Sequence, residues 1–324
     1  MFIIIARAVQ IGACLIILSL FTFDLLIAAP GLRPADRSAL PSVETLRGQF
    51  RWLAVWSGLA AIGSGVAWFW IVLAQLTGAR LWEMPSMDSI NETITRTQFG
   101  RLWEWRLGLM LMFTIVCLFA STKGRNALWK SRAFQCVGAM VATTLLASLG
   151  WAGHAGARLG AQRPIHLTAD AAHLTLAGLW PGGLLPLTLF LVRTWRSNEP
   201  SLLLAAGAMT RRFSALSLFV VGALAGTGLV NSYFLVGSFR ALVATDYGRL
   251  LMLKLFLFLI MIGLGAWNRR RLNPQLKAAG ESTDQQRAAL RKLMRNVIAE
   301  LCIGTLIVLI VAALGVTPPP HHRM

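Results

Sequence analysis

Long apolar stretches alternate with short polar segments along almost the whole chain. Eight stretches are each long enough to cross the hydrocarbon core of a bilayer, which takes roughly 20 residues of helix. They cover residues 2–29, 52–76, 101–120, 133–152, 168–192, 213–236, 248–267 and 297–316. The pattern predicts an all-α integral membrane protein with about eight transmembrane helices.

The composition agrees with a bilayer as the solvent. Hydrophobic residues make up 56% of the 324 residues, charged residues only 14%, and the mean hydropathy is +0.62. Because about a quarter of the residues in a soluble domain are charged, this composition excludes an ordinary soluble protein. The first stretch is long and carries Arg7 well inside it, so we expect a retained helix and not a cleaved signal sequence.

The basic residues predict the orientation in the membrane. The formal net charge is +18, but no aromatic and basic nucleic-acid-binding module accompanies it. The segments after the first, third, fifth and seventh stretches carry 20 Lys and Arg residues, and those after the second, fourth and sixth carry 7. Since Lys and Arg concentrate on the cytoplasmic side, both termini are predicted to face the periplasm. Lipid, and not nucleic acid, is then the surrounding partner.

A motif near the start of the third stretch recurs near the start of the seventh. The run Thr97-Gln-Phe-Gly-Arg reads like Thr245-Asp-Tyr-Gly-Arg, and each is followed five positions later by a basic residue, Arg106 or Lys254. The recurrence indicates an internal duplication.

The duplication predicts two four-helix halves, residues 1–155 and 156–324, within a single membrane domain of residues 1–324. An even number of helices in each half gives both halves the same orientation, which is a parallel repeat. Transporters often bind their substrate between such halves.

Candidate metal ligands gather at the predicted periplasmic end. His166, Asp170 and His173 fall at positions i, i+4 and i+7, which share one face of a helix. They lie near the start of the fifth helix, and His154 closes the fourth helix on the same side. The sequence therefore predicts that these side chains can cooperate.

Further ligand types are expected at the same end. His321 and His322 follow three prolines near the C-terminus, and Met84 and Met87 lie in the loop after the second helix. Imidazole and carboxylate suit Cu, Zn or Ni, and thioethers favour copper. Two other interpretations stay open, namely a buried polar pair that joins helices and a proton relay.

The whole chain resembles the copper resistance protein D family (CopD/PcoD) of multi-pass inner-membrane proteins. The resemblance rests on runs of residues distributed over both halves and more specific in the second. These runs are Gly153-His-Ala, Ala169-Asp-Ala-Ala-His-Leu, Gly178-Leu-Trp, Gly182-Gly-Leu-Leu-Pro-Leu, Phe213-Ser, Gly226-Thr-Gly-Leu-Val-Asn, the Thr245 to Lys254 motif, and Asn268-Arg with Pro274.

The resemblance implies a copper ion of unspecified oxidation state, the bacterial inner membrane, and a soluble periplasmic copper-binding protein of the CopC type as partner. One departure is Pro181, which replaces an aliphatic residue of the family pattern. Proline removes a backbone donor, and with Gly182 and Gly183 beside it a helix break is expected. The break serves either to expose carbonyl groups to an ion or to allow close packing.

The residues also limit the mechanism. The chain has no phosphate-binding loop and its four cysteines form no Cys-x-x-Cys pair, which argues against an ATP-driven pump, and we expect no enzyme activity. Cys117, Cys136 and Cys302 are candidate soft sites on an inner path, and Glu300 is expected to pair with a neighbouring Arg or Lys.

The favoured function is copper import from periplasm to cytoplasm through the external His, Asp and Met residues. Two alternatives remain. One is a haem-binding b-type electron-transfer protein, which would need paired histidines at one depth. The other is a receptor or sequestering protein that holds copper without transporting it.

Overall fold

A computed structural model describes residues 1–31, 40–121, 126–157, 160–197, 199–276 and 283–320 of the chain, and these ranges form helices and no strands. Eight membrane-spanning segments are long and apolar enough to cross a bilayer, which confirms the all-α membrane fold. The segments are α1 (Phe2–Phe23) with η1 (Asp24–Ala28) and α2 (Ala29–Gly31); α3 (Leu40–Thr77); α5 (Gln98–Ala120); α7 (Arg132–Ser148) with η3 (Leu149–Ala152); α9 (Arg163–Leu179) with α10 (Leu184–Arg196); α11 (Pro200–Leu235); α13 (Asp246–Trp267) with η4 (Asn268–Leu272) and α14 (Asn273–Gln275); and α15 (Thr283–Leu314).

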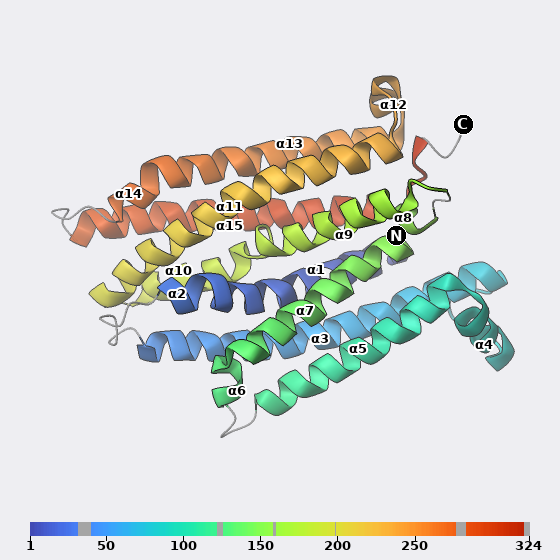
Figure 1. The fold of residues 1–324 in the computed structure, drawn as a ribbon, viewed down its shortest axis with the longest axis horizontal. Helices are drawn as coiled ribbons and strands as arrows, with labels where there is room; N and C mark the ends of the chain where they lie inside the picture. The colour runs from blue at the N-terminus through green and yellow to red at the C-terminus, as the bar shows by residue number, and fades with distance from the viewer. Residues whose placement is uncertain (32–39, 122–125, 158–159, 198, 277–282, 321–324) are drawn as a thin grey trace.

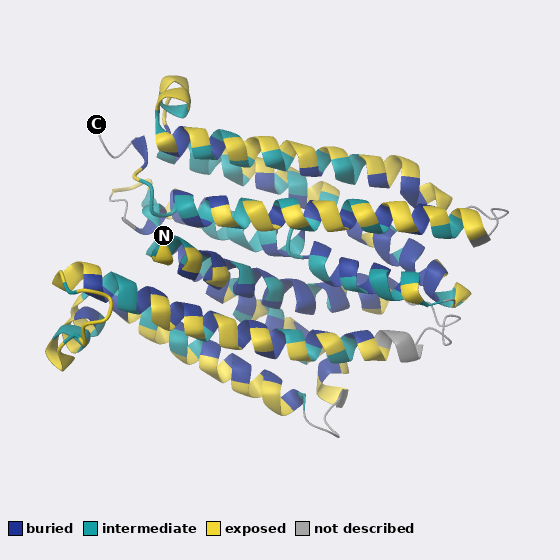
Figure 2. Cartoon of the chain, turned by 180° about the vertical axis from the view of Figure 1, so that it is seen from behind, coloured by how far each residue is buried: buried dark blue, intermediate teal, exposed yellow. Residues whose placement is uncertain are grey.

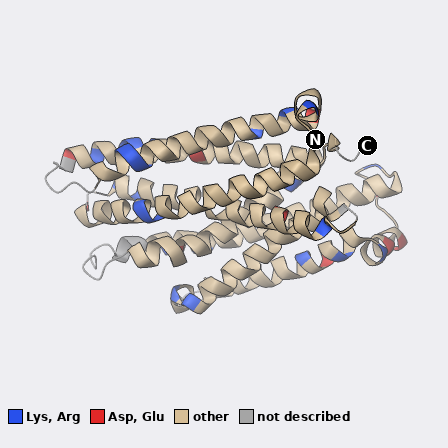
Figure 3. Ribbon diagram, turned by 45° about the horizontal axis from the view of Figure 1, so that its top comes forward, with Lys and Arg blue, Asp and Glu red and all other residues tan. Residues whose placement is uncertain are grey.

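The helices run up and down along one long axis (Figure 1). Both termini lie at the same end of the bundle, together with the short helices α4 (Met87–Arg96), α8 (His154–Ala157) and α12 (Phe239–Ala244). We call this the terminal end. The opposite end holds α6 (Asn126–Lys130) and α14, and we call it the basic end, because the Lys- and Arg-rich segments lie there. Figure 3 shows that charged residues lie mainly toward the ends of the helices.

Three helices begin earlier than their apolar stretches. The helices α3, α11 and α15 extend beyond the predicted spans at the basic end, to residues 40, 200 and 283. Hydropathy marks the hydrocarbon layer and not the end of a helix, and the added turns contain basic residues, such as Arg47, Arg211 and Arg287, that lower the hydropathy there. This is why the sequence prediction found the spans but placed these starts 12 to 14 residues too late.

The first helix forms the centre of the bundle. It packs against α3, α7, α9 and α15, and its span is 72% buried, against 17% for the spans of α11 and α13. Figure 2 shows buried residues on the inward faces of the helices and exposed residues on the outward faces. Because α1 contacts helices from both parts of the chain, side chains on α1 can connect them.

The break at Pro181 serves close packing. The helix α9 ends at Leu179, α10 starts at Leu184, and the Gly182 N–H donates to the carbonyl of Ala177 at 2.9 Å. A Cβ on Gly182 would lie 3.1 Å from the carbonyl oxygen of Leu15 on α1. The predicted break is therefore present, and it lets α1 approach this turn closely.

Two other prolines follow π-helical turns. One π-helical turn, η1, ends two residues before Pro30, and the other, η4, ends two residues before Pro274. A proline has no N–H and its ring clashes with the carbonyl four residues earlier. The helix widens there, and Ala29 and Asn273 donate to carbonyls five residues back.

The recurring motif has the same structure at both places. The Thr97 and Thr245 hydroxyls accept a hydrogen bond from the N–H of Gly100 at 2.8 Å and of Gly248 at 3.0 Å. Each hydroxyl also donates to a carbonyl four residues earlier, at 2.7 Å. A Cβ on either glycine would lie 2.1 Å from a carbonyl oxygen of α4 or α12. Glycine therefore lets these short helices fold back onto α5 and α13.

Candidate functional site

Four charged side chains that are at least partly buried lie inside the spans, one to three turns from the terminal end. They are Arg7 on α1, Arg106 on α5, Asp170 on α9 and Lys254 on α13. The charges of Arg7 and Lys254 act on Asp170, and the charge of Arg106 acts on Arg7. Since intramembrane charges are costly and usually functional, this group is the starting point for a site.

The hydrogen bonds of His173 define its tautomer. Its Nδ1 lies 2.9 Å from the Thr227 hydroxyl, and that hydroxyl donates its own hydrogen to the carbonyl of Ala223 at 2.8 Å. A hydroxyl has only one hydrogen to donate, so Nδ1 carries the ring proton and Thr227 accepts it. The lone pair is then on Nε2, which lies 3.3 Å from the Lys254 ammonium.

Asp170 lies one turn before His173 on α9 and supplies the negative charge. The Asn231 amide donates to its Oδ1 at 3.4 Å. The other carboxylate oxygen lies 3.1 Å from where a Cβ on Gly150 would stand, so glycine is needed there for close approach. The Asn231 Oδ1 atom is buried and has no hydrogen-bond partner among the described residues. A buried oxygen without a donor can serve a cation.

We call His173, Asp170, Lys254, Thr227 and Asn231 the α9 cluster. Its side chains come from α9, α11 and α13, and all five residues are partly buried. The helix α11 packs mainly on α9, and α13 mainly on α15. The cluster therefore lies between the α9–α11 pair and the α13–α15 pair.

The structure places the other predicted ligands elsewhere. The His154 Nε2 lies 3.1 Å from the carbonyl oxygen of Leu314, and its ring packs edge-on against Tyr247 with 6.3 Å between centroids. His166 is 1% exposed and its ring lies 5.0 Å from that of Phe234. The predicted stripe on α9 therefore separates into Asp170 and His173 in the cluster and His166 in an aromatic contact.

The methionines lie on the surface at the terminal end. Met84 and Met87, between α3 and the start of α4, are 87% and 81% exposed. His321 and His322 lie outside the described residues. Within the described ranges, three or more His, Cys, Asp or Glu residues are nowhere close enough together to hold a metal ion.

The equivalent position in the first motif has different neighbours. Arg106 is 4% exposed and its Nη2 has no hydrogen-bond partner among the described residues. Nearby, the Gln10 amide donates to the Met110 sulfur at 3.2 Å and accepts from Ser64 at 2.8 Å. A cavity of about 10 Å³ lined by Gln10, Arg106 and Met110 has room for about one water molecule. This region has no histidine and no carboxylate among those contacts.

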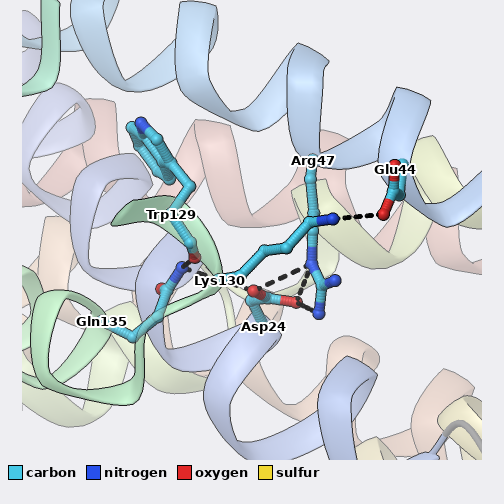
Figure 4. A network of polar contacts seen from close by, with 6 residues as sticks. All are labelled: Asp24, Glu44, Arg47, Trp129, Lys130 and Gln135. Carbon is cyan, nitrogen blue, oxygen red and sulfur yellow. Dashed lines mark hydrogen bonds and ion pairs between the residues drawn. The ribbon is translucent and has the colours of Figure 1, made fainter. Parts of the chain in front are cut away.

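The basic end contains an ion-pair network around Asp24. Arg47 binds Asp24 through Nε at 3.0 and 3.2 Å and through Nη2 at 3.0 Å, and Gln135 donates to the same carboxylate at 3.3 Å (Figure 4). Lys130 pairs with Glu44 beside it. These bonds join α3 to η1, the first turn of α7 and α6, so a structural role explains the network.

Glu300 does not have the partner that the sequence suggested. It is 2% exposed, and its carboxylate accepts from the Asn268 amide at 2.7 Å, with Asn296 donating to Asn268 at 2.8 Å. No Lys or Arg among the described residues pairs with it. The π-turn that begins at Asn268 places this amide, a feature that sequence spacing does not reveal.

Two of the three candidate cysteines are exposed, and only one is buried. Cys136 and Cys302 are exposed on the outside of α7 and α15, and Cys117 is buried. An exposed side chain within a span faces the lipid and not the bundle interior. The position of a cysteine along the chain predicts its depth in the membrane, but it does not show which face of the helix turns inward.

Sequence reasoning missed the partners of His173. Lys254, Thr227 and Asn231 lie 54 to 81 positions away from their partners on α9. The one available signal was the recurring basic residue of the motif, which marked Arg106 and Lys254 as equivalent positions. Nothing in that pattern showed that Lys254 faces the histidine.

Taken together, eight spans and a histidine, carboxylate and lysine cluster within them define a multi-pass membrane protein with a polar site in the bilayer. Two family models match this chain. The N-terminal domain of copper resistance protein D-like proteins matches residues 1–164, and copper resistance protein D matches residues 207–314. The chain belongs to the copper resistance protein D family.

Known relatives agree. The chain is 28% identical to copper resistance protein D of Pseudomonas syringae pv. tomato over 75% of this chain and 76% of the relative. It is 29% identical to the inner membrane protein YebZ of Escherichia coli over 74% and 75%. It is 31% identical to the copper transport protein CutJ of Bacillus subtilis over 55% of this chain but only 31% of CutJ.

No solved structure matches the chain. The family and the eight spans identify a copper-related, multi-pass inner-membrane protein. The family is named for copper resistance, and one relative for copper transport, and neither name denotes catalysis.

Proposed function

We propose that this protein carries copper ions across the inner membrane from periplasm to cytoplasm, and that the ion passes through the α9 cluster. The observation that carries the proposal is the Nε2 lone pair of His173, which lies inside the bundle beside Asp170 and the unpartnered oxygen of Asn231. Imidazole binds both copper oxidation states, and the carboxylate offsets the charge of the ion. The copper-related family supports the choice of ion.

The direction follows from the proposed orientation. The terminal end faces the periplasm, because the segments at the basic end carry most of the Lys and Arg residues of the sequence. The membrane potential, negative inside, contributes about 2.3 kcal/mol per charge per 100 mV to cation entry. Import then needs ligands along a path and no ATP.

Capture takes place at the periplasmic surface. Met84 and Met87 are exposed there beside the acidic residues Glu83 and Asp88, which suits a soft cation or a positively charged carrier. His154, at the same end, is the next imidazole on the way in. The exposed methionine segment is the proposed docking point of a soluble periplasmic copper-binding protein of the CopC type. His321 and His322 remain further candidate ligands for this capture step.

Uptake into proteoliposomes tests the proposal. Purified protein is reconstituted, an inside-negative potential is imposed, and uptake of isotopically labelled copper is compared between wild type and His173→Gln. We expect potential-dependent uptake in the wild type and at least a tenfold lower initial rate in the variant, because the variant lacks the imidazole lone pair. His166→Gln is the matched control, since His166 lies on the same helix but outside the cluster, and it should retain most of the uptake.

The outcomes separate the functional classes. Copper binding without uptake in the wild type would contradict transport and favour a receptor or sequestering protein. Equal uptake by wild type and His173→Gln would contradict the assigned path. A Soret absorption band in the purified protein would indicate a haem protein instead.

A further inference from the structure

The Lys254 side chain occupies the place of a bound cation. Its ammonium lies 3.3 Å from His173 Nε2, and its charge acts on the Asp170 carboxylate. These are the two groups that would hold a copper ion under the proposed function. Because Nε2 carries the lone pair, it accepts a hydrogen bond from the ammonium and has no second lone pair for a metal.

We propose that Lys254 is a tethered competitor cation, which closes the α9 cluster when no ion is bound and must move away before a copper ion binds His173. The inference rests on the proposed function. It assigns to Lys254 a role in affinity and release, and not a role as a ligand.

Electrostatics gives the competition its strength. An ammonium within a few ångströms of the site repels a second cation, and this repulsion is large where water is scarce. Arg7 also acts on Asp170. If Lys254 loses its charge, Asp170 still has a cationic partner, so the cluster does not become an isolated buried anion.

A flexible lysine side chain suits a carrier that must also release its ion. A lysine has four rotatable side-chain bonds and a compact charge, so its ammonium can leave Nε2 and return. The returning ammonium replaces the copper ion at both His173 and Asp170. The empty site then regains the hydrogen bond from the Lys254 ammonium to His173 Nε2, and the lysine charge again acts on the Asp170 carboxylate.

The position of Lys254 on α13 supports this role. The capped turn at Thr245 and Gly248 fixes the start of α13, and Lys254 lies about two turns further along, directly opposite α9. The first motif places Arg106 at the same position, but the hydrogen-bonded group beside it is Gln10, Ser64 and Met110. The Arg106 guanidinium therefore has no imidazole among these neighbours with which it could form such a hydrogen bond.

Equilibrium binding tests the competition. Purified protein in detergent is titrated with Cu(I) buffered by a competing chelator, and in parallel with Cu(II), for wild type, Lys254→Gln and Lys254→Arg. We expect Lys254→Gln to bind copper at least tenfold more tightly, because the repulsion and the blocking hydrogen bond are gone. Lys254→Arg keeps the charge and should stay within threefold of wild type. In the double variant with His173→Gln, the gain should disappear.

Transport gives a second, independent readout. In proteoliposomes, Lys254→Gln should reach half-maximal uptake at lower copper and show a lower maximal rate, because the ion is held and no ammonium returns to displace it. A variant that merely misfolds would lose binding as well as rate, and Lys254→Arg would show whether the position tolerates change.

The results distinguish this inference from the proposed function. If His173→Gln abolishes copper binding but Lys254→Gln binds no more tightly than wild type, the competition is wrong and the assigned site stands. If His173→Gln binds copper as well as wild type, the α9 cluster is not the copper site. Weaker binding by Lys254→Gln would make Lys254 a supporting residue and overturn the inference.

Discussion

The two motif regions at the terminal end differ in chemistry although they fold alike. At Thr97 and at Thr245, a threonine caps a long helix and a glycine admits a short helix that folds back. About two turns later, Arg106 and Lys254 point into the bundle. Around Arg106 lie an amide, a hydroxyl and a thioether, whereas around Lys254 lie an imidazole and a carboxylate.

The motif therefore fixes where the basic side chain lies along its helix. The neighbouring helix determines which groups that side chain faces. Both basic residues lie at the same spacing from a capping threonine, so the caps fix their places along α5 and α13. Whether the charge has a function depends on what the adjacent helix presents, Gln10 on α1 or His173 on α9. Arg7 on the central helix connects the two regions, since its charge acts with both Arg106 and Asp170.

The largest expected effect comes from Asp170, the carboxylate that acts on both Arg7 and Lys254. Asp170→Asn keeps the size and the contact to Asn231 but leaves two basic side chains without a counter-charge. Uncompensated buried charges typically cost about 3 kcal/mol. We expect a clearly lower midpoint of thermal unfolding in detergent, together with loss of copper binding.

Arg106 is the matched control for this prediction. Its guanidinium pairs with no carboxylate among the described residues, so Arg106→Met removes a costly buried charge and no ion pair. Its stability should equal or exceed that of wild type, and copper binding should persist. A large destabilisation by Arg106→Met alone would contradict the difference between the two regions, because it would show that the Arg106 charge stabilises the fold.

The glycines of the two motifs should respond equally. Gly100→Ala and Gly248→Ala each place a Cβ against a carbonyl oxygen at 2.1 Å, which forces the short helix away from the long one. Overpacking of this kind costs about 1–3 kcal/mol. We expect similar drops in the unfolding midpoint for both, measured by the same assay. An effect at only one glycine would contradict the structural equivalence of the two turns.

The sequence predicted the eight spans, the break at Pro181 and the recurring motif, because hydropathy and helix breakers are local properties. It also placed Asp170 and His173 on one face of a helix. It did not predict that His166 packs on Phe234, or that Lys254 lies at His173, because such contacts depend on how helices rotate and pair. The same limit explains Glu300, whose partner Asn268 is set by a π-turn.

The most direct test of the central claim is the X-ray absorption spectrum of the protein loaded with one equivalent of copper. A Met84→Leu/Met87→Leu background removes the exposed thioethers, so that the spectrum reports the ion within the bundle. If the ion lies in the α9 cluster, we expect nitrogen and oxygen neighbours, with the nitrogen contribution lost in His173→Gln. A sulfur neighbour that persists in His173→Gln would place the ion at thiol or thioether groups, such as Cys14 and Met110 beside the Gln10 amide, and would contradict passage through the α9 cluster.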